Sequence, residues 1–319
     1  MCKKINTFFP CLLGGYFAFS MIISIILGMF DMDLPYWASI VLSQSALLLP
    51  AIIYCIVMKI NVFKCIPYRK IKPLDALYSI LVGYMIIPIV IFINSITMLF
   101  ATNHMEESTS ELTSYPFIAQ IILLAVIPPI VEEFIFRGLF YHSYRKNGIL
   151  GAAVASGIVF GIVHMNINQF CYTVLMGIFL AIMVEATGSM FSAMLAHFAF
   201  NTYSITMMKL LEVFNVSTEA TEGTIEAATE TVAVSDTAMI VGQIMGVLIW
   251  GIIGVAFLMM AYMLIMHMAK RNGREQYLRF NFKKGLKPQN GEKFYNLSYI
   301  ITAVLAGIYM VLIEIASRV

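Results

Sequence analysis

The chain has 319 residues, of which 60% are hydrophobic and only 12% are charged, and its formal net charge is +2. Soluble domains are about 45–50% apolar and about 25% charged. These proportions exclude an ordinary water-soluble fold, because so few charged residues could not cover its surface. The apolar residues also form long blocks, and a block of about 18 or more residues with few charges predicts a membrane-spanning helix. We therefore expect an all-α, polytopic transmembrane helix bundle.

Nine such blocks follow one another, near residues 8–30, 35–58, 74–101, 117–141, 148–165, 170–187, 189–211, 237–268 and 296–316. The first follows two lysines and so resembles a signal peptide. Its apolar run is longer than is typical of a signal peptide, and no A-x-A site ends it, so we expect an uncleaved span. Turns that contain Gly, at 147–148 and 187–188, are expected to join the fourth span to the fifth and the sixth to the seventh.

Charges in the connecting segments predict the orientation of the bundle. Lys and Arg occur before the first span and after the second, fourth and eighth, whereas Asp and Glu predominate in the segments between, around 31–33, 106–111 and 212–236. Because cytoplasmic loops carry the excess of Lys and Arg, the N-terminus is expected in the cytoplasm, and nine passes then place the C-terminus outside. The basic loop at 270–293 is expected to attract anionic lipid, and it is too short to predict nucleic-acid binding.

The charge pattern and the spans together divide the chain into four parts. These are N-terminal transmembrane helices (1–116), a core (117–211), an acidic outer loop (212–236) and C-terminal transmembrane helices with the basic cytoplasmic loop (237–319).

The fourth span carries charged side chains where the bilayer makes them costly. Glu132, Glu133 and Arg137 interrupt an otherwise apolar stretch, and such groups persist inside a membrane only when they are paired or hydrated. Glu133 and Arg137 are four residues apart and can pair on one helix face. Glu132 points about 100° away from that face and can meet another helix. Pro128 and Pro129 are expected to break or kink the helix just before these residues.

Two further spans carry histidines. The fifth ends with Phe160 and His164, and the seventh contains His197 and Asn201 on one helix face. Counted from the turn at 147–148, Glu132 and His164 both lie about 23 Å along their helices and can face each other. His197 lies only about 14 Å from the turn at 187–188 and fits this level less well. Glu185 and Glu314 are near span ends, so we expect their side chains to reach the interface.

This set of side chains can support hydrolysis. A carboxylate and two imidazoles can act as general bases on water, or they can hold zinc, for which Glu132, His164 and His197 would be the ligands. An Asn amide can donate a hydrogen bond to a developing oxyanion. The sequence contains neither G-x-S-x-G nor H-E-x-x-H, the motifs of a serine nucleophile and of a common zinc protease. Water is therefore the expected nucleophile.

The three motifs, in this order within apolar helices, resemble those of the CPBP (Abi) family of intramembrane proteases, which includes the CAAX prenyl endopeptidases and bacteriocin-processing proteins. They stand here as Glu132-Glu133-Phe134-Ile135-Phe136-Arg137, Phe160-Gly161-Ile162-Val163-His164 and His197-Phe198-Ala199-Phe200-Asn201. The resemblance covers about residues 117–211, which would be the protease core, and implies an endopeptidase that cuts a membrane-associated peptide or protein. The flanking spans leave the substrate open, so a prenylated substrate is not implied.

The resemblance also implies roles for individual residues. Glu132 would be the general base, His164 would help to activate water, and His197 and Asn201 would stabilise the oxyanion. The catalytic set is then Glu132, Glu133, His164, His197 and Asn201, with Arg137 and Phe160 in support. The family has been described both as metal-dependent and as metal-independent, and we favour the form that needs no cofactor.

Two other functions fit parts of the sequence. A non-proteolytic membrane scaffold or bacteriocin-immunity protein could retain the fold without the chemistry. A transporter or proton relay could use the same buried carboxylates, but it needs a polar path to both faces, and we expect almost no polar lining from the first three spans. Under each of these functions the chain is expected in a membrane, and a bacterial plasma membrane is favoured.

Overall fold

The computed structural model describes residues 2–101, 114–214, 236–288 and 291–318, and these residues contain helices and no strand. The first half of the bundle consists of α1 (Cys2–Phe30), α2 (Tyr36–Val57), the short α3 (Val62–Cys65), α4 (Pro73–Met85) and α5 (Ile87–Thr97). The fourth predicted span is a composite of α7 (Phe117–Gln120), the π-helix η1 (Ile121–Val126), α8 (Ile127–Glu133), the π-helix η2 (Phe134–Tyr141), α9 (His142–Tyr144) and η3 (Arg145–Asn147). The rest comprises α10 (Ile149–Val163), α11 (Ile167–Thr187), α12 (Met190–Val213), α14 (Asp236–Arg271), α15 (Glu275–Lys284) and α16 (Leu297–Ala316).

Each of the nine predicted spans coincides with a helix or a run of helices, so the polytopic all-α bundle is confirmed. Within the described ranges, seven helical segments are long and apolar enough to cross a membrane. The two spans outside that set are α10, which has 15 residues, and α12, whose hydropathy is lowered by the polar side chains of the site. Both expected turns are present, with Gly148 at φ 131° and Gly188 at φ 71°. The predicted acidic outer loop at 212–236 lies almost wholly outside the described residues.

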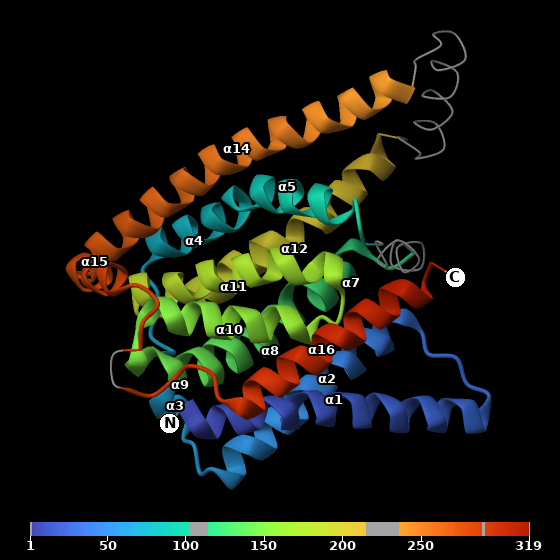
Figure 1. Ribbon diagram of the computed structural model, residues 1–319, viewed down its shortest axis with the longest axis horizontal. Helices are drawn as coiled ribbons and strands as arrows, with labels where there is room; N and C mark the ends of the chain where they lie inside the picture. The colour runs from blue at the N-terminus through green and yellow to red at the C-terminus, as the bar shows by residue number, and fades with distance from the viewer. Residues whose placement is uncertain (1, 102–113, 215–235, 289–290, 319) are drawn as a thin grey trace.

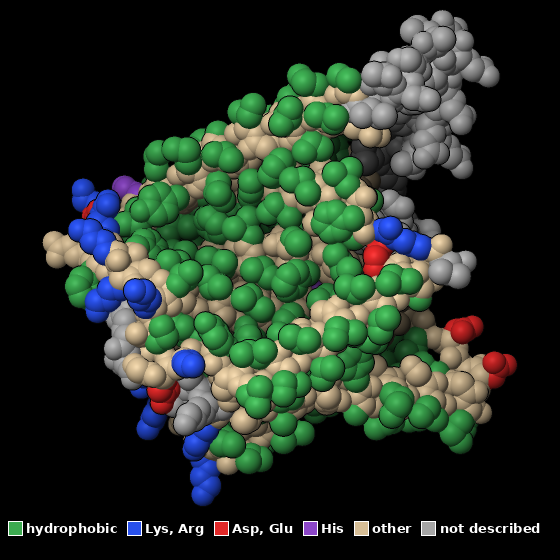
Figure 2. All heavy atoms as spheres, in the orientation of Figure 1, with side chains coloured by type: hydrophobic (Ala, Val, Ile, Leu, Met, Phe, Trp, Pro, Cys, Tyr) green, Lys and Arg blue, Asp and Glu red, His purple; other side chains and the backbone are tan. Residues whose placement is uncertain are grey.

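The helices run between two chemically different ends. The N-terminus lies at one end and the C-terminus at the other, as an odd number of passes requires (Figure 1). Lys and Arg side chains gather at the end that carries α15, while hydrophobic side chains cover the middle of the molecule (Figure 2). We call the first the basic end, defined by the segments at 59–72, 145–146 and 270–287, and the other the acidic end, defined by Asp31 and Asp33.

Small residues bring α10 and α11 unusually close together. A Cβ on Gly177 would lie 2.9 Å from Gly157 Cα, and one on Gly161 would lie 2.6 Å from a methyl group of Val174. Membrane helices gain little from the hydrophobic effect against each other, so close backbone approach at small residues is a main source of their packing energy. The α10–α11 pair therefore forms a tight hairpin around which the composite fourth span packs.

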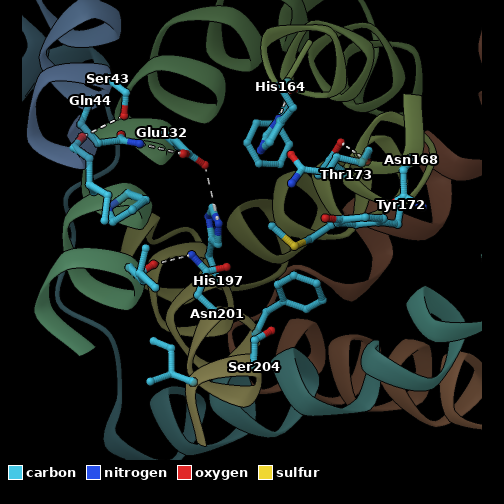
Figure 3. Close-up of a pocket in the computed structure, with 18 of the residues that line it drawn as sticks. Ser43, Gln44, Glu132, His164, Asn168, Tyr172, Thr173, His197, Asn201 and Ser204 are labelled. Atoms are coloured by element: carbon cyan, nitrogen blue, oxygen red, sulfur yellow. Dashed lines mark hydrogen bonds and ion pairs between the residues drawn. The ribbon is translucent and has the colours of Figure 1, made fainter. Parts of the chain in front are cut away.

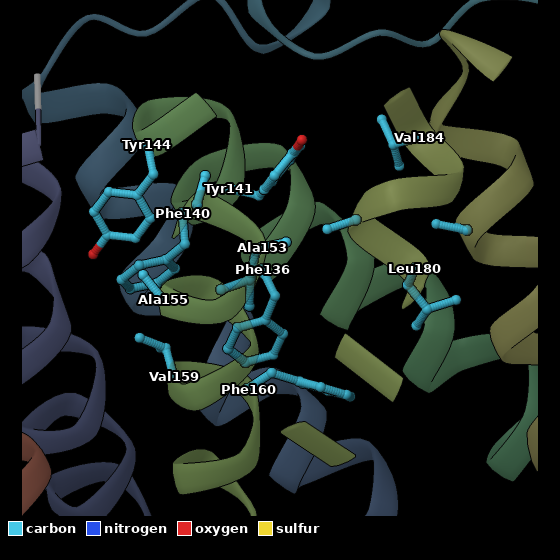
Figure 4. Close-up of a cluster of buried hydrophobic side chains, with 14 of the residues drawn as sticks. Phe136, Phe140, Tyr141, Tyr144, Ala153, Ala155, Val159, Phe160, Leu180 and Val184 are labelled. Atoms are coloured by element: carbon cyan, nitrogen blue, oxygen red, sulfur yellow. The ribbon is translucent and has the colours of Figure 1, made fainter. Parts of the chain in front are cut away.

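A cluster of buried aromatic and aliphatic side chains fills the bundle between the functional site and the basic end (Figure 4). The rings of Phe136 and Phe140 of η2 stack with their centroids 6.3 Å apart. The ring centroid of Phe160 of α10 lies 4.9 Å from that of Phe136. Leu180 of α11 is also completely buried. Such dense packing between η2, α10 and α11 fixes the position of the charged residues that immediately precede η2.

The basic end is held together by a buried carboxylate, contrary to the expectation that Glu185 reaches the interface. Only 1% of Glu185 is exposed. Its carboxylate accepts two hydrogen bonds from Arg145, at 2.5 and 2.8 Å, one from Arg274 at 2.9 Å and one from the Tyr141 hydroxyl at 3.0 Å. Glu314 is also buried and pairs with Arg318 at 2.8 Å. The side chain of Glu185 remains inside because partners from three helical segments neutralise it there.

Candidate active site

The backbone next to the site is shaped by two consecutive prolines. Pro128 and Pro129 lack the N–H groups that would reach the carbonyl of Leu124 in an α-helix or a π-helix, respectively. Here the chain passes from η1 into α8, so the expected interruption is confirmed. The released carbonyl of Leu124 accepts a hydrogen bond of 2.9 Å from Nδ2 of Asn201. A backbone defect in the fourth span thus anchors a polar side chain of α12.

Glu132 points from α8 to the edge of a cavity, where it meets two other helices (Figure 3). Its Oε2 lies 3.7 Å from Nε2 of His197, and its Oε1 accepts a weak hydrogen bond of 3.4 Å from Nε2 of Gln44 on α2. Glu132 is 8% exposed, whereas its neighbour Glu133 is completely buried. The two adjacent carboxylates therefore have different surroundings, as their separation of about 100° around the helix predicts.

Glu133 links two of the predicted residues beneath the cavity. Its Oε1 lies 3.0 Å from Nη1 of Arg137, which confirms the expected pair, and it accepts a hydrogen bond of 2.9 Å from Nδ1 of His197. The Arg137 guanidinium also lies over the ring of Phe160, 4.5 Å from its centroid, a favourable arrangement for a cation. Because Nδ1 of His197 donates its proton to Glu133, a neutral imidazole presents the lone pair of Nε2 towards Glu132.

His164 lies where α10 ends. It is the first residue after Val163, and its Nδ1 donates a hydrogen bond of 2.8 Å to the Phe160 carbonyl. That bond fixes the tautomer in which Nε2 can accept a proton. Met165 then reverses the chain at φ 48°, and the side chain of Asn166 caps α11. His164 lines the same cavity as Glu132, as their equal distances from the shared turn predict.

The cavity has a volume of about 760 Å³ and is partly open, which is in the range of pockets that accept small ligands or peptide segments. Eight helical elements supply its lining, and the first three predicted spans contribute five polar side chains to it: Tyr16, Tyr36, Ser43, Gln44 and Asn94. The prediction that those spans offer almost no polar lining is therefore wrong. Single amide and hydroxyl groups scattered through apolar helices give no periodic signal, so the sequence did not reveal that they share one cavity.

All seven predicted site residues come together. Glu132, Phe160, His164, His197 and Asn201 line the cavity, and Glu133 and Arg137 lie directly beneath it. His197 lies closer along its helix to the 187–189 turn than Glu132 does to the turn at 147–148. It still reaches the level of Glu132 because the 187–189 turn lies deeper, covered by the segment before α4. Met190 N bonds to the Pro67 carbonyl at 2.9 Å, and Ser189 Oγ bonds to the Arg69 carbonyl at 2.6 Å. The α12 helix thus starts inside the protein and not at its surface.

Gln44 is the missed residue that contacts Glu132 directly. It is an amide between two serines in an otherwise apolar span, and that polar interruption was the available signal. A lone amide has ordinary packing explanations, however, and its partner Glu132 is 88 positions away. Only the packing of α2 against α8 reveals the contact.

The donor groups do not form a metal site in this arrangement. Zinc ligands all lie about 2.0–2.3 Å from the ion, so three of them must converge closely. Across the described ranges, no three side chains of His, Cys, Asp or Glu converge in this way. Nδ1 of His197 is engaged by Glu133 and Nδ1 of His164 by its own helix, so only Nε2 of each could ligate an ion. A zinc ion would require Glu132, His164 and His197 to move together.

Comparison with known proteins identifies the segment that contains this site. Residues 114–203 match the family model described as "Type II CAAX prenyl endopeptidase Rce1-like". The matched segment belongs to the CAAX prenyl endopeptidase-like (CPBP) family. It contains every predicted site residue, and it begins and ends near the bounds of the core expected at 117–211.

A curated relative of the CAAX endopeptidase-like segment comes from Bacillus subtilis (strain 168) and is named "Putative membrane peptidase YdiL". The two are 31% identical over 88 residues, which is 27% of this chain and 36% of the relative. This chain thus matches about a third of the length of that relative. No solved structure matches this chain.

Proposed function

We propose that this protein is an intramembrane endopeptidase that hydrolyses a peptide bond of a membrane-associated peptide or protein, with water activated by Glu132. The observation that carries the proposal is the convergence of Glu132, His164, His197 and Asn201 on one partly open cavity within an apolar bundle. Side chains that are costly in a membrane face one another here and not the lipid. The CAAX endopeptidase-like match over 114–203 supports the same reaction class.

Glu132 is the general base in this proposal. Of the two carboxylates, it is the one that reaches the cavity, and no arginine lies within ion-pairing distance of it among the described residues. Its Oε2 and Nε2 of His197 are 3.7 Å apart, too far for a direct hydrogen bond but suited to a shared water molecule. A proton taken from that water by Glu132 would later be delivered to the leaving amine.

His197 and Asn201 stabilise the tetrahedral intermediate. Glu133 accepts a hydrogen bond from Nδ1 of His197 and so fixes the imidazole, whose Nε2 donates to the oxyanion when it carries a proton. Asn201 is anchored by one of its two amide hydrogens to Leu124, so the second remains available to an oxyanion. His164 presents Nε2 from the opposite wall and helps to position the water. This scheme requires no metal or other cofactor.

The proposal is tested by cleavage of a library of quenched fluorogenic peptides by the purified protein in nanodiscs. The wild type should cleave a subset of the library, and Glu132→Gln and His197→Ala should not, although they fold. Glu314→Gln is the matched control, since it changes another buried glutamate that lies outside the cavity, and it should retain activity. A scaffold or immunity protein would cleave no member of the library and would keep its cellular phenotype in Glu132→Gln.

A further inference from the structure

The direction of each helix shows which end of the bundle the cavity approaches. α10 starts directly after Arg145 and Lys146 at the basic end and carries His164 at its far end, and α11 runs back. The α11 residues that line the cavity, from Asn168 to Met176, all belong to its first ten positions. They therefore lie in the half of the bundle away from the basic end.

The other helices that line the cavity place it in the same half of the bundle. α12 starts at the basic end, and its lining residues, from His197 to Met208, begin only at the eighth of its 24 positions. α2 follows Asp33 and contributes residues from Tyr36 to Gln44, which lie in its first half. On α5, which ends at the acidic end, the lining residue is Asn94, near the end of the helix. The cavity therefore extends towards the acidic end.

The short length of α10 creates the hollow. Its 15 residues span about 22 Å, whereas the hydrocarbon core of a bilayer is about 30 Å thick. α10 therefore ends, and the chain reverses at Met165, before it has crossed that thickness. Non-helical backbone at this depth is tolerated where it lines a water-filled space.

From the basic end, a hollow of only about 80 Å³ reaches inwards to Arg137, well below the roughly 300–1,000 Å³ of ligand pockets. Between the cavity and the basic end lie the buried rings of Phe136 and Phe140 and the side chain of Leu180 (Figure 4). Beyond them, the contacts of Glu185 with Arg145 and Arg274 tie the segments together. A peptide could reach Glu132 from the basic end only by displacing this core.

The lining indicates the chemistry of what enters. Among the described residues that line the cavity, Glu132 is the only carboxylate, and none is Lys or Arg. The rest are amides, hydroxyls, aromatic rings and aliphatic groups (Asn94, Asn168, Gln169, Tyr172, Thr173 and Ser204 among them). Such a lining offers hydrogen bonds to a peptide backbone and lacks a cation that could bind a terminal carboxylate.

We propose that the site takes an uncharged internal segment of a membrane-associated protein from the non-cytoplasmic face of the membrane. The cavity extends towards the acidic end, and Lys and Arg mark the cytoplasmic side of a membrane protein, so the cavity faces away from the cytoplasm. The proposal rests on the proposed function for the cleavage step, but the direction of access can be measured without cleavage.

Access is tested with two single-cysteine variants in a background whose five cysteines are replaced. Ser204→Cys places a thiol on an exposed position that lines the cavity, and Lys64→Cys places one on an exposed position at the basic end. Sealed right-side-out and inside-out vesicles are treated with a membrane-impermeant sulfonated maleimide. Ser204→Cys should be labelled at least tenfold faster in right-side-out vesicles, and Lys64→Cys in inside-out vesicles. Labelling of Ser204→Cys only from the inside would overturn the proposal.

Cleavage gives a second measurement on the unmodified chain. Library peptides that the purified protein cleaves are coupled to dextran, which cannot cross the bilayer, and are added to the two kinds of vesicle. Cleavage in right-side-out vesicles supports access from outside, and cleavage only in inside-out vesicles contradicts it. If the purified protein cleaves no peptide, the proposed function fails, and the labelling result alone decides the direction of access.

Discussion

His197 and Glu133 are 64 positions apart and are joined by a hydrogen bond of 2.9 Å between Nδ1 and Oε1. The bond connects α12 to α8 and also connects the imidazole to the Arg137 guanidinium, which lies 3.0 Å from the same oxygen. One oxygen of Glu133 therefore both accepts the hydrogen bond from His197 and balances the buried charge of Arg137. Glu132 has neither of these contacts, so substitutions of the two adjacent glutamates should have different effects.

Glu133→Gln should destabilise the protein more than Glu132→Gln. It leaves the Arg137 charge buried without a counter-ion, and removal of one partner from a buried pair costs about 3–5 kcal/mol. Glu132 is at the cavity edge, so its amide variant should fold with nearly unchanged stability and fail only in activity. Thermal unfolding in detergent measures the difference. The double variant Glu133→Gln with Arg137→Met should recover much of the lost stability, and if it did not, the ion pair would not be the cause.

Gln44→Leu should lower the turnover number by about tenfold with little change in KM. The side chain is of similar size, but it removes a hydrogen bond to a charged group, which is worth about 1.5–3 kcal/mol at good geometry and less at 3.4 Å. Steady-state kinetics on a cleaved library peptide provide the measurement. Ser45→Ala, next on the same helix but bonded to its own backbone at Val41, is the control. Equal activity of Gln44→Leu and wild type would remove Gln44 from the site.

Chelation should leave activity unchanged. The arrangement of Glu132, His164 and His197 does not fit a zinc ion without rearrangement, and the proposed chemistry uses the carboxylate and imidazoles directly. Activity should survive 1,10-phenanthroline, and elemental analysis of the active protein should find metal well below one ion per chain. Loss of activity on chelation that is restored by zinc alone would contradict the cofactor-free proposal while leaving the protease function intact.

Glu185→Ala should reduce stability without direct loss of chemistry. The carboxylate is 1% exposed and serves Arg145, Arg274 and Tyr141; its removal should cost about 3–5 kcal/mol, reduced to the extent that water reaches the two partly exposed arginines. Glu275→Ala is the matched control, because its pair with Arg279 is exposed and such pairs contribute about 0–1 kcal/mol. Comparable melting temperatures for the two variants would show that the Glu185 contacts are dispensable.

The sequence predicted those parts of the site that depend on helical spacing. The pairing of Glu133 with Arg137 follows from a separation of four residues, and the placement of Glu132 and His164 on one cavity follows from equal distances to one tight turn. The depth of the 187–189 turn depends instead on the segment at 66–72, which packs over it. Which glutamate His197 would contact depends on the rotation of α12 about its own axis. Neither quantity leaves a local trace in the sequence.

The position of Gln44 and the walls contributed by α1, α2 and α5 have a consequence for the design of truncated variants. The matched segment, residues 114–203, contains the recognised motifs, but Tyr16, Gln44 and Asn94 lie outside it. Excised from its neighbours, that fragment would turn Glu132 and His197 towards hydrocarbon, with nothing to shelter the water they are to share. The helices that carry the motifs therefore do not form a complete site by themselves. Chimeras or truncated variants must keep the N-terminal spans.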